Sequence, residues 1–246
     1  MPILSSYVYD TIQTILRKDQ KGNAFSISEF NRIAPIANFS LYNFYVANLE
    51  ESQEVTEETK AFMTLNHEIT LTSGVGSLPA YGRMLGVPYV ISGQDTIPVD
   101  LVTNLELPFR LSDELTKPTA LHPIAILGGK TGANKNITVY PASTSSVRIN
   151  YLSIPATPVL DFYIDTNGLY VYLDQGETGV SIPAGAVYSD GTVGPTTKDS
   201  QTVDFEWHED QVPMIISEVL QKAGLILSEQ VAIEYGIARE TKEETQ

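Results

Sequence analysis

The stretch DFEWHEDQVPMIISEVLQKAG, residues 204–224, decides how the two ends of this chain fold together. It contains the single tryptophan of the sequence, Trp207, beside His208 and among four acidic residues: Asp204, Glu206, Glu209 and Asp210. Downstream, apolar residues recur at the spacing of one helix face: Val212, Ile215, Ile216, Val219, Leu220 and Ala223. Two interpretations compete, a metal or catalytic cluster and the capped start of a helix.

Pro213 favours the helix start. A proline inside a helix removes a hydrogen bond and clashes with the preceding turn, so a helix that began at Glu206 would break there. We expect Asp210 to be the N-cap residue, Pro213 to lie in the first turn and Gly224 to end the helix. Glu206 and Glu209 would then stabilise the positive end of the helix dipole, each by about 0.3 to 1 kcal/mol. A metal site is disfavoured, because hydrolytic sites usually need a second histidine at helical spacing.

Two aromatic residues, Phe205 and Trp207, precede this cap and are predicted to be apolar anchors. We expect them and the apolar stripe from Val212 to pack on the N-terminal helices of the same chain. A neighbouring copy of the chain is the alternative partner.

The first 50 residues also have helical patterns. Val8, Ile12, Ile15 and Leu16 recur at helical spacing, and Lys21-Gly22-Asn23 ends that segment. Ser26 and Glu29 form a capping-box pattern that starts a second helix, in which Pro35 predicts a kink. Its apolar stripe comprises Phe30, Ile33, Ala34, Ala37, Leu41, Phe44 and Tyr45. The acidic residues 49–60 are interpreted as a solvated extension or a linker.

From residue 61 the pattern changes to short alternating runs separated by glycine and proline, which indicates β-strands. We predict a strand with one face formed by Leu65, His67, Ile69 and Leu71. A hairpin is predicted at 123–127 and 136–140, followed by a strand with Val147, Ile149 and Tyr151 on one side. A second hairpin turns at Asn167-Gly168. Residues 174–202 are predicted to be a long surface loop, in which 180–182 and 186–188 could pair as short strands.

The expected fold class is α+β, with N- and C-terminal helices packed as a helical unit and an antiparallel β-domain inserted between them. The boundaries are 1–60 for the N-terminal helices, 61–203 for the β-rich domain and 204–246 for the C-terminal helices. A last helix is predicted after Ser228, with an apolar side of Val231, Ala232, Tyr235 and Ala238.

Composition excludes several classes of function. The chain of 246 residues has no cysteine, which rules out disulfides, thiolate metal sites and cysteine nucleophiles. Its formal net charge of −15 disfavours binding to nucleic acid or to an anionic membrane, although an acidic ring would let DNA pass without binding it. No apolar run reaches the ~20 residues of a membrane span, and no signal peptide is recognisable, so we expect a soluble protein made in a cytoplasm.

No catalytic motif is complete. The sequence LGGKTG, residues 127–132, resembles part of a phosphate-binding loop, but Ile124 stands where that motif needs its first glycine. The histidines, His67, His122 and His208, are scattered, and a hydrolase in which they converge is the weakest of three hypotheses. Tyr170 and Tyr172 share one face of a predicted hairpin, where a cross-strand pair is the default and an interface or a glycan platform is the alternative. We therefore expect no enzyme, no cofactor and no metal.

Four stretches resemble the neck or head-to-tail ring proteins of tailed bacteriophages, especially those of crAss-like and related short-tailed phages. They are KDQKGNAFSISEFNRIAPIANFSLYNFYVANLE at 18–50, LTKPTALHPIAIL at 115–127, ITVYPASTSSVRINYLSIPATP at 137–158 and VDFEWHEDQVPMIISEVLQKAGLILSEQVAIEYG at 203–236. The resemblance is one of overall layout and leaves out 174–202, where this chain is longer than the family pattern. Contact with tail or fibre proteins is one role for that loop.

The resemblance implies a virion structural protein, assembled in the bacterial host cytoplasm, that forms a ring in the neck or tail between portal and tail components. Its partners would be copies of itself, a dodecamer like the portal, together with the portal protein and other neck or tail proteins. Packaged DNA would pass through an acidic lumen without specific binding, and no membrane would be involved. The family's C-terminal motif falls on Phe205, Trp207, Asp210, Ile215, Val219 and Tyr235. Phe30, Leu41 and Phe44 complete the set of expected structural or interface residues. The competing hypothesis is a carbohydrate-binding or adhesion module that uses exposed tyrosines.

Overall fold

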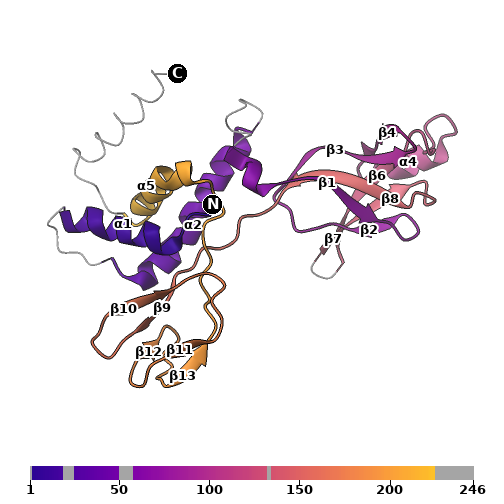
Figure 1. Cartoon of the computed structure of the whole chain (residues 1–246). Coiled ribbons are helices and arrows are strands. Elements are labelled where there is room, and N and C mark those ends of the chain that lie inside the picture. Colours follow the sequence, from indigo (N-terminus) through magenta and orange to yellow (C-terminus); the bar gives the residue numbers. More distant parts are fainter. Residues whose placement is uncertain (1, 19–24, 50–57, 132–133, 225–246) are drawn as a thin grey trace, which may run out of the picture. The chain divides into compact units, whose positions relative to one another are not determined.

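The computed structural model describes residues 2–18, 25–49, 58–131 and 134–224 (Figure 1). The chain divides into two compact units: unit 1 comprises residues 1–61 and 155–246, and unit 2 comprises residues 62–154. The fold class is α+β, as predicted, with helices towards both ends of the chain and antiparallel sheets between them.

The predicted N-terminal helices are both present in unit 1. Helix α1 spans Ser5–Lys18, and α2 spans Ile27–Ala47 and continues through Pro35. The capping box at the start of α2 is confirmed: Ser26 Oγ accepts a hydrogen bond from Glu29 N at 3.2 Å, and Ser26 N donates to Glu29 Oε2 at 2.9 Å. These reciprocal bonds satisfy backbone donors that would otherwise have no partner at the helix start. They also hold the pKa of Glu29 below its ordinary value.

The C-terminal helix α5 spans Val212–Lys222, and its predicted cap is wrong. Asp210 lies inside a short 3-10 turn, η2, at Glu209–Gln211, and the residue that caps this turn is His208. The backbone of His208 is extended, and its Nδ1 accepts from Asp210 N at 3.5 Å. Pro213 is the second residue of α5, where its missing N–H leaves no helix bond unmade. Gly224 follows the helix with a φ of +67°, so its predicted role as terminating glycine is confirmed.

Trp207 joins α2 to the C-terminal segment, as expected for a contact within one chain. Its side chain is fully buried, its ring centroid lies 5.5 Å from that of Tyr45, and its Nε1 donates to Asn38 Oδ1 at 2.6 Å. Asn38 Nδ2 in turn donates to the carbonyl of Ala156 at 3.0 Å. Phe205, also buried, pairs its backbone with Ile3 through two hydrogen bonds of 2.9 and 3.0 Å. Helices α1 and α2 therefore pack against α5, and the segment that contains Phe205 and Trp207 joins them.

The β-rich domain predicted at 61–203 is divided, because residues 155–203 belong to unit 1. Asn31 of α2 holds this segment through both polar atoms of its amide: Nδ2 donates to the carbonyl of Leu160 at 2.9 Å, and Oδ1 accepts from Leu160 N at 2.8 Å. Asn31 and Asn38 are seven residues apart and so lie on the same face of the helix. Together they fix the chain from Ala156 to Leu160 along α2.

The segment 174–202 is more ordered than the predicted surface loop. The expected hairpin forms from β9 (Asp161–Ile164) and β10 (Tyr170–Leu173), with Gly168 in the left-handed region at φ +82°. Both suggested short strands exist, as β11 (Val180–Ile182) and β12 (Val187–Tyr188), but they do not pair with each other. Strand β12 joins the hairpin at β9, and β11 pairs with β13 (Thr196–Lys198).

Unit 2 consists of two four-stranded sheets with a shared core. One sheet has the order β1-β8-β3-β4 and the other the order β2-β7-β6-β5, and all pairings are antiparallel except that of β5 with β6. The first sheet contains β1 (Met63–Thr70), β8 (Ser146–Leu152), β3 (Arg83–Ser92) and β4 (Asp95–Pro98). The second contains β2 (Val75–Ser77), β7 (Asn134–Tyr140), β6 (Ile124–Thr131) and β5 (Asp100–Leu101). Val147, Ile149 and Tyr151 are buried in the core as predicted, and β6 and β7 form the predicted hairpin.

The face predicted for β1 is only partly correct. Ile69 and Leu71 are buried, but Leu65 is exposed. The register with β8 shifts between Thr64 and His67, and Asn66 in that bulge has a φ of +58°. Because a bulge adds one residue to the alternation, side chains before it point to the opposite face.

The bond between Trp207 and Asn38 yields a prediction for stability. We expect Trp207→Phe to lower the free energy of unfolding of unit 1 by roughly 1 to 3 kcal/mol, because it leaves the buried Asn38 Oδ1 without its donor. Urea unfolding followed by far-UV circular dichroism would measure the change. Ser217→Ala, on the exposed side of α5, is the matched control and should stay within about 0.5 kcal/mol. Equal urea midpoints for the unchanged protein, Trp207→Phe and Ser217→Ala would contradict a stabilising role for the bond between Trp207 and Asn38.

Candidate interaction surfaces

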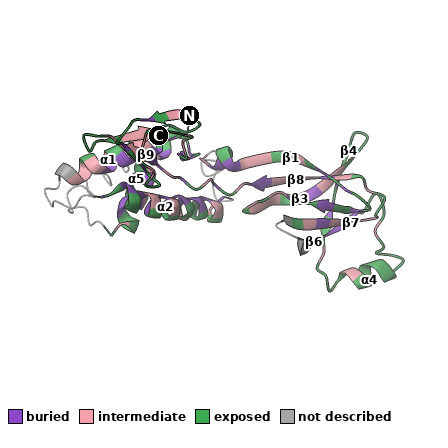
Figure 2. Ribbon diagram, turned by 90° about the horizontal axis from the view of Figure 1, so that it is seen from below, coloured by how far each residue is buried: buried purple, intermediate pink, exposed green. Residues whose placement is uncertain are grey.

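The segment between β5 and β6, residues 103–122, carries the most exposed large apolar side chains of the described chain, and we call it the arm. It contains the short helix α4, Leu107–Ser112, in which no residue is buried (Figure 2). Four side chains of the arm are far more exposed than is usual for their type: Leu115 at 94%, Leu105 at 82%, Phe109 at 76% and Leu121 at 69%.

Local hydrogen bonds define the backbone of the arm. In the turn that precedes α4, Thr103 and Glu106 exchange two hydrogen bonds: Thr103 N donates to Glu106 Oε2 at 2.9 Å, and Glu106 N donates to Thr103 Oγ1 at 3.3 Å. These bonds hold the pKa of Glu106 below its ordinary value. Asp113 accepts from Leu115 N at 3.0 Å and from Thr116 Oγ1 at 3.1 Å, which fixes the turn after the helix. The apolar side chains therefore project from an ordered backbone.

The arm includes a hollow of about 420 Å³ that opens to solvent. Its lining combines apolar and charged side chains: Glu106, Phe109, Arg110, Ser112, Asp113 and Thr116. The sequence analysis did not predict that the arm would be an exposed apolar surface. The Thr103-x-x-Glu106 capping pattern and the high frequency of leucine between two strands were the available signals.

A second exposed apolar surface lies on α2. Phe44 was predicted on the inward stripe of this helix, but it is 53% exposed, together with Ile36 at 55% and Phe39 at 50%. The other members of that stripe, including Phe30 and Leu41, are buried as predicted. Helix α2 thus has an inward face that packs on α5 and an outward face with three large apolar side chains.

The remaining expected structural or interface residues lie mostly inside unit 1. Phe205, Trp207, Ile215 and Val219 are each at most 1% exposed, so they form the core of one chain and not a surface for another. Asp210 is exposed, and Tyr235 lies outside the described residues.

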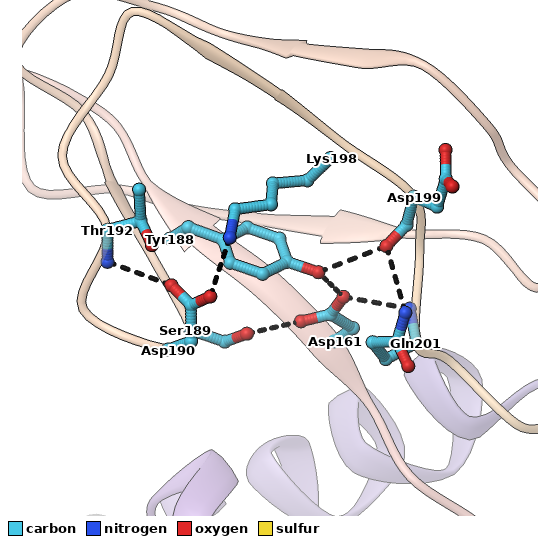
Figure 3. A network of polar contacts seen from close by, with 8 residues as sticks. All are labelled: Asp161, Tyr188, Ser189, Asp190, Thr192, Lys198, Asp199 and Gln201. Carbon is cyan, nitrogen blue, oxygen red and sulfur yellow. Dashed lines mark hydrogen bonds and ion pairs between the residues drawn. The ribbon is translucent and has the colours of Figure 1, made fainter.

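A polar network centred on the buried Asp161 joins the small strands of unit 1 (Figure 3). Its carboxylate accepts hydrogen bonds from the Tyr188 hydroxyl, the Ser189 hydroxyl and the backbone N–H of Gln201. Asp161 N donates to Thr202 Oγ1 at 3.0 Å, and that hydroxyl donates to the carbonyl of Leu173 at 2.6 Å. The network connects β9, β10 and β12 to the chain that returns to α5, which makes it a structural cluster.

Lys198 covers the outer side of this network. Its Nζ lies 2.7 Å from Asp190 Oδ2 and 5.2 Å from the centre of the Tyr188 ring. The hydrogen bonds from Lys198 and Thr192 lower the pKa of Asp190 to about 2. Burial and the adjacent Asp161 carboxylate raise the pKa of Tyr188 well above its ordinary value.

The three histidines have separate surroundings within their units. His67, in unit 2, packs edge-on against Tyr151 with ring centroids 5.5 Å apart, and His122 is an exposed turn residue of the arm. His208, in unit 1, contacts Asp210 Oδ2 at 2.9 Å on an exposed surface. Within residues 2–18, 25–49, 58–131 and 134–224, no three His, Asp or Glu side chains are placed to hold a metal ion.

The tyrosine pair of the β9–β10 hairpin does not form a platform of two free rings. Tyr170 is exposed and lies 5.3 Å from Phe162 by ring centroids. Tyr172 packs edge-on against Tyr9 of α1 at 6.0 Å, and its hydroxyl contacts Asp10 Oδ1 at 3.3 Å. A glycan could therefore stack on only one of these two tyrosines.

No protein-family model matches this sequence, and no curated protein matches it either. None of the helices in the described part of the chain is both long enough and apolar enough to cross a membrane.

The raised pKa of Tyr188 yields a prediction for pH dependence. The folded protein holds this proton more tightly than the unfolded chain, whose tyrosines titrate near pH 10. The stabilisation is therefore fully present below about pH 10 and is lost as the pH rises towards the pKa of folded Tyr188. We expect the free energy of unfolding to fall more steeply between about pH 9.5 and 11 in the unchanged protein than in Tyr188→Phe. If urea titrations gave the two proteins the same pH dependence of the free energy of unfolding, the stabilising role of the Tyr188–Asp161 contact would be contradicted.

Proposed function

We propose that this chain is a non-enzymatic structural subunit of a bacteriophage virion, which associates with copies of itself into a ring in the neck or tail. The observation that carries self-association is the arm, in which Leu105, Phe109 and Leu115 project from a backbone held by local hydrogen bonds. Exposed apolar surface costs about 25 cal/mol for each Å² left in water, and large patches of it on a soluble protein usually mark interfaces.

The chemistry of the arm favours a protein partner. The hollow of the arm places Phe109 beside Arg110 and Asp113, and exposed leucines lie elsewhere on the arm. Such a mixture of apolar and charged side chains is common in protein interfaces. A ring requires that one surface of each copy contacts a different surface of the next copy, because such head-to-tail contacts close when the rotation between copies divides a full circle. An arm in contact with a distinct surface of the next copy fits this requirement.

The phage setting of the proposal is supported by the resemblance of residues 18–50, 115–127, 137–158 and 203–236 to neck ring proteins. The net charge of −15 suits a ring around packaged DNA, because acidic surfaces repel phosphate and allow the duplex to pass. Under this proposal the ring would contact the portal protein on one side and other neck or tail proteins on the other. A dodecamer would match the symmetry of the portal.

Light scattering coupled to size-exclusion chromatography, with negative-stain electron microscopy, tests this function. We expect a species larger than the monomer whose share rises with protein concentration, and closed rings in the images, alone or with added portal protein. A chain that stays monomeric under all these conditions and is retained on glycan arrays would instead support an adhesion module.

Substitution of the arm should weaken self-association. We expect Leu115→Asp to raise the dissociation constant by about ten- to a hundredfold, since burial of a leucine contributes about 1.5 to 3 kcal/mol. Leu169→Asp, at an exposed turn of unit 1, is the matched control and should leave the constant unchanged. Sedimentation velocity over a concentration series measures both values. Identical constants for Leu115→Asp and the unchanged protein would show that the arm is not the contact.

A further inference from the structure

The outward face of α2 has the spacing that receives a large side chain from a facing helix. Four of its residues lie at positions i, i+3, i+4 and i+7, and we call them the α2 diamond: Ile36, Phe39, Ser40 and Asn43. In packed helices, a diamond of this spacing is where one side chain of the partner inserts. Because each residue turns the helix by about 100°, the smaller Ser40 and Asn43 lie between the exposed rings of Phe39 and Phe44. This face therefore has large apolar side chains at its flanks and small ones between them.

The arm carries a side chain suited to this diamond. Phe109 lies in the middle of α4, is 76% exposed and lines the hollow of the arm. Three charged residues line the same hollow: Glu106, Arg110 and Asp113. Both carboxylates of that lining accept hydrogen bonds from backbone N–H groups of the arm, at 2.9 and 3.0 Å, so their positions are fixed. Since two carboxylates outweigh one guanidinium, the arm presents an aromatic ring beside a net negative charge.

The charge beside the α2 diamond is opposite to that of the hollow. Arg32 is exposed, lies one turn before the diamond on the same side of the helix, and is the last charged residue of α2. The carboxylate of the preceding Glu29 is engaged in the cap of the helix. With Phe109 on the diamond, an antiparallel α4 brings Asp113 near the Arg32 guanidinium, and a parallel α4 brings Glu106 near it instead. Such pairing of opposite charges adds specificity to a contact between apolar side chains.

A different apolar surface of unit 1 fits the arm less well. Leu169 and Tyr170 are both exposed at the end of the β9–β10 hairpin. The Asp165 carboxylate lies at the same turn, where it accepts hydrogen bonds from Leu169 N and Asn167 N, each at 2.8 Å. Its negative charge would face the negative hollow of the arm, and like charges across an interface oppose association. The α2 diamond, with a cation beside it, is therefore the better partner for the arm.

We propose that Phe109 of one copy packs on the α2 diamond of the next copy, with Arg32 against a carboxylate of the arm. The inference rests on the ring function proposed above and names the second surface of its contact. The arm and the diamond are different surfaces of the chain, so each copy binds one neighbour through its arm and another through its diamond. An assembly with such contacts grows by addition at its ends until it closes.

Mixing two variants that each lack one of the surfaces tests the contact. Phe109→Asp removes the inserted ring and Phe39→Asp removes one flank of the diamond, so we expect each variant alone to associate about ten- to a hundredfold more weakly than the unchanged protein. A mixture of equal amounts should recover association but stop at dimers. The reason is that only the intact diamond of Phe109→Asp and the intact arm of Phe39→Asp can meet. Sedimentation velocity over a concentration series measures this, and far-UV circular dichroism confirms that each variant is folded.

Tyr7→Asp is the matched control, because Tyr7 is a comparably exposed aromatic residue on α1 and should not affect association. Equal weakening by Tyr7→Asp and Phe39→Asp would attribute the loss to the added charge and overturn the contact. A mixture that associates no better than its two components would also overturn it, while leaving the arm as a contact with some other surface. If the unchanged protein stayed monomeric at every concentration, with and without portal protein, the ring function and this contact would both be overturned.

Discussion

The hydrogen bond from the Trp207 indole to the side chain of Asn38 is the contact on which unit 1 depends. Asn38 is buried in the middle of α2 and also binds the carbonyl of Ala156, so one amide connects three segments that are far apart in the sequence. Asn31, on the same side of α2, binds both backbone polar groups of Leu160. A buried amide without such partners would destabilise the fold, and with them it selects one arrangement of the chain. The inward side of α2 therefore combines apolar packing with two amides, Asn31 and Asn38, that fix which segments pack against it.

This arrangement explains why the residues first expected at an interface are internal. The C-terminal segment packs on α1 and α2 through four buried side chains: Phe205, Trp207, Ile215 and Val219. Among the exposed apolar side chains of the described residues, the four most exposed belong to the arm of unit 2, and Ile36, Phe39 and Phe44 lie on the outward side of α2. We interpret the arm as a contact between copies of the chain.

The sequence predicted those elements whose signals are local. The Ser26–Glu29 capping box, the Asn167-Gly168 turn, the alternation of Val147, Ile149 and Tyr151, and the terminating Gly224 are each set by a few neighbouring residues. It did not predict that residues 155–203 belong with the helices, because that depends on Asn31 and Asn38, which are more than 100 residues away from their partners. The N-cap of α5 was also misplaced: the 3-10 turn Glu209–Gln211 takes up Asp210, so α5 begins after Gln211, which makes no side-chain capping bond. Leu65 was misplaced because a bulge leaves no mark in an alternating pattern.

Amide hydrogen exchange measured at low and high protein concentration tests most directly whether the arm joins copies of the chain. If the account is correct, exchange in residues 103–122 slows as concentration rises, because self-association covers the arm. An arm whose exchange is independent of concentration in a protein that does associate would contradict the central claim that the arm joins the copies.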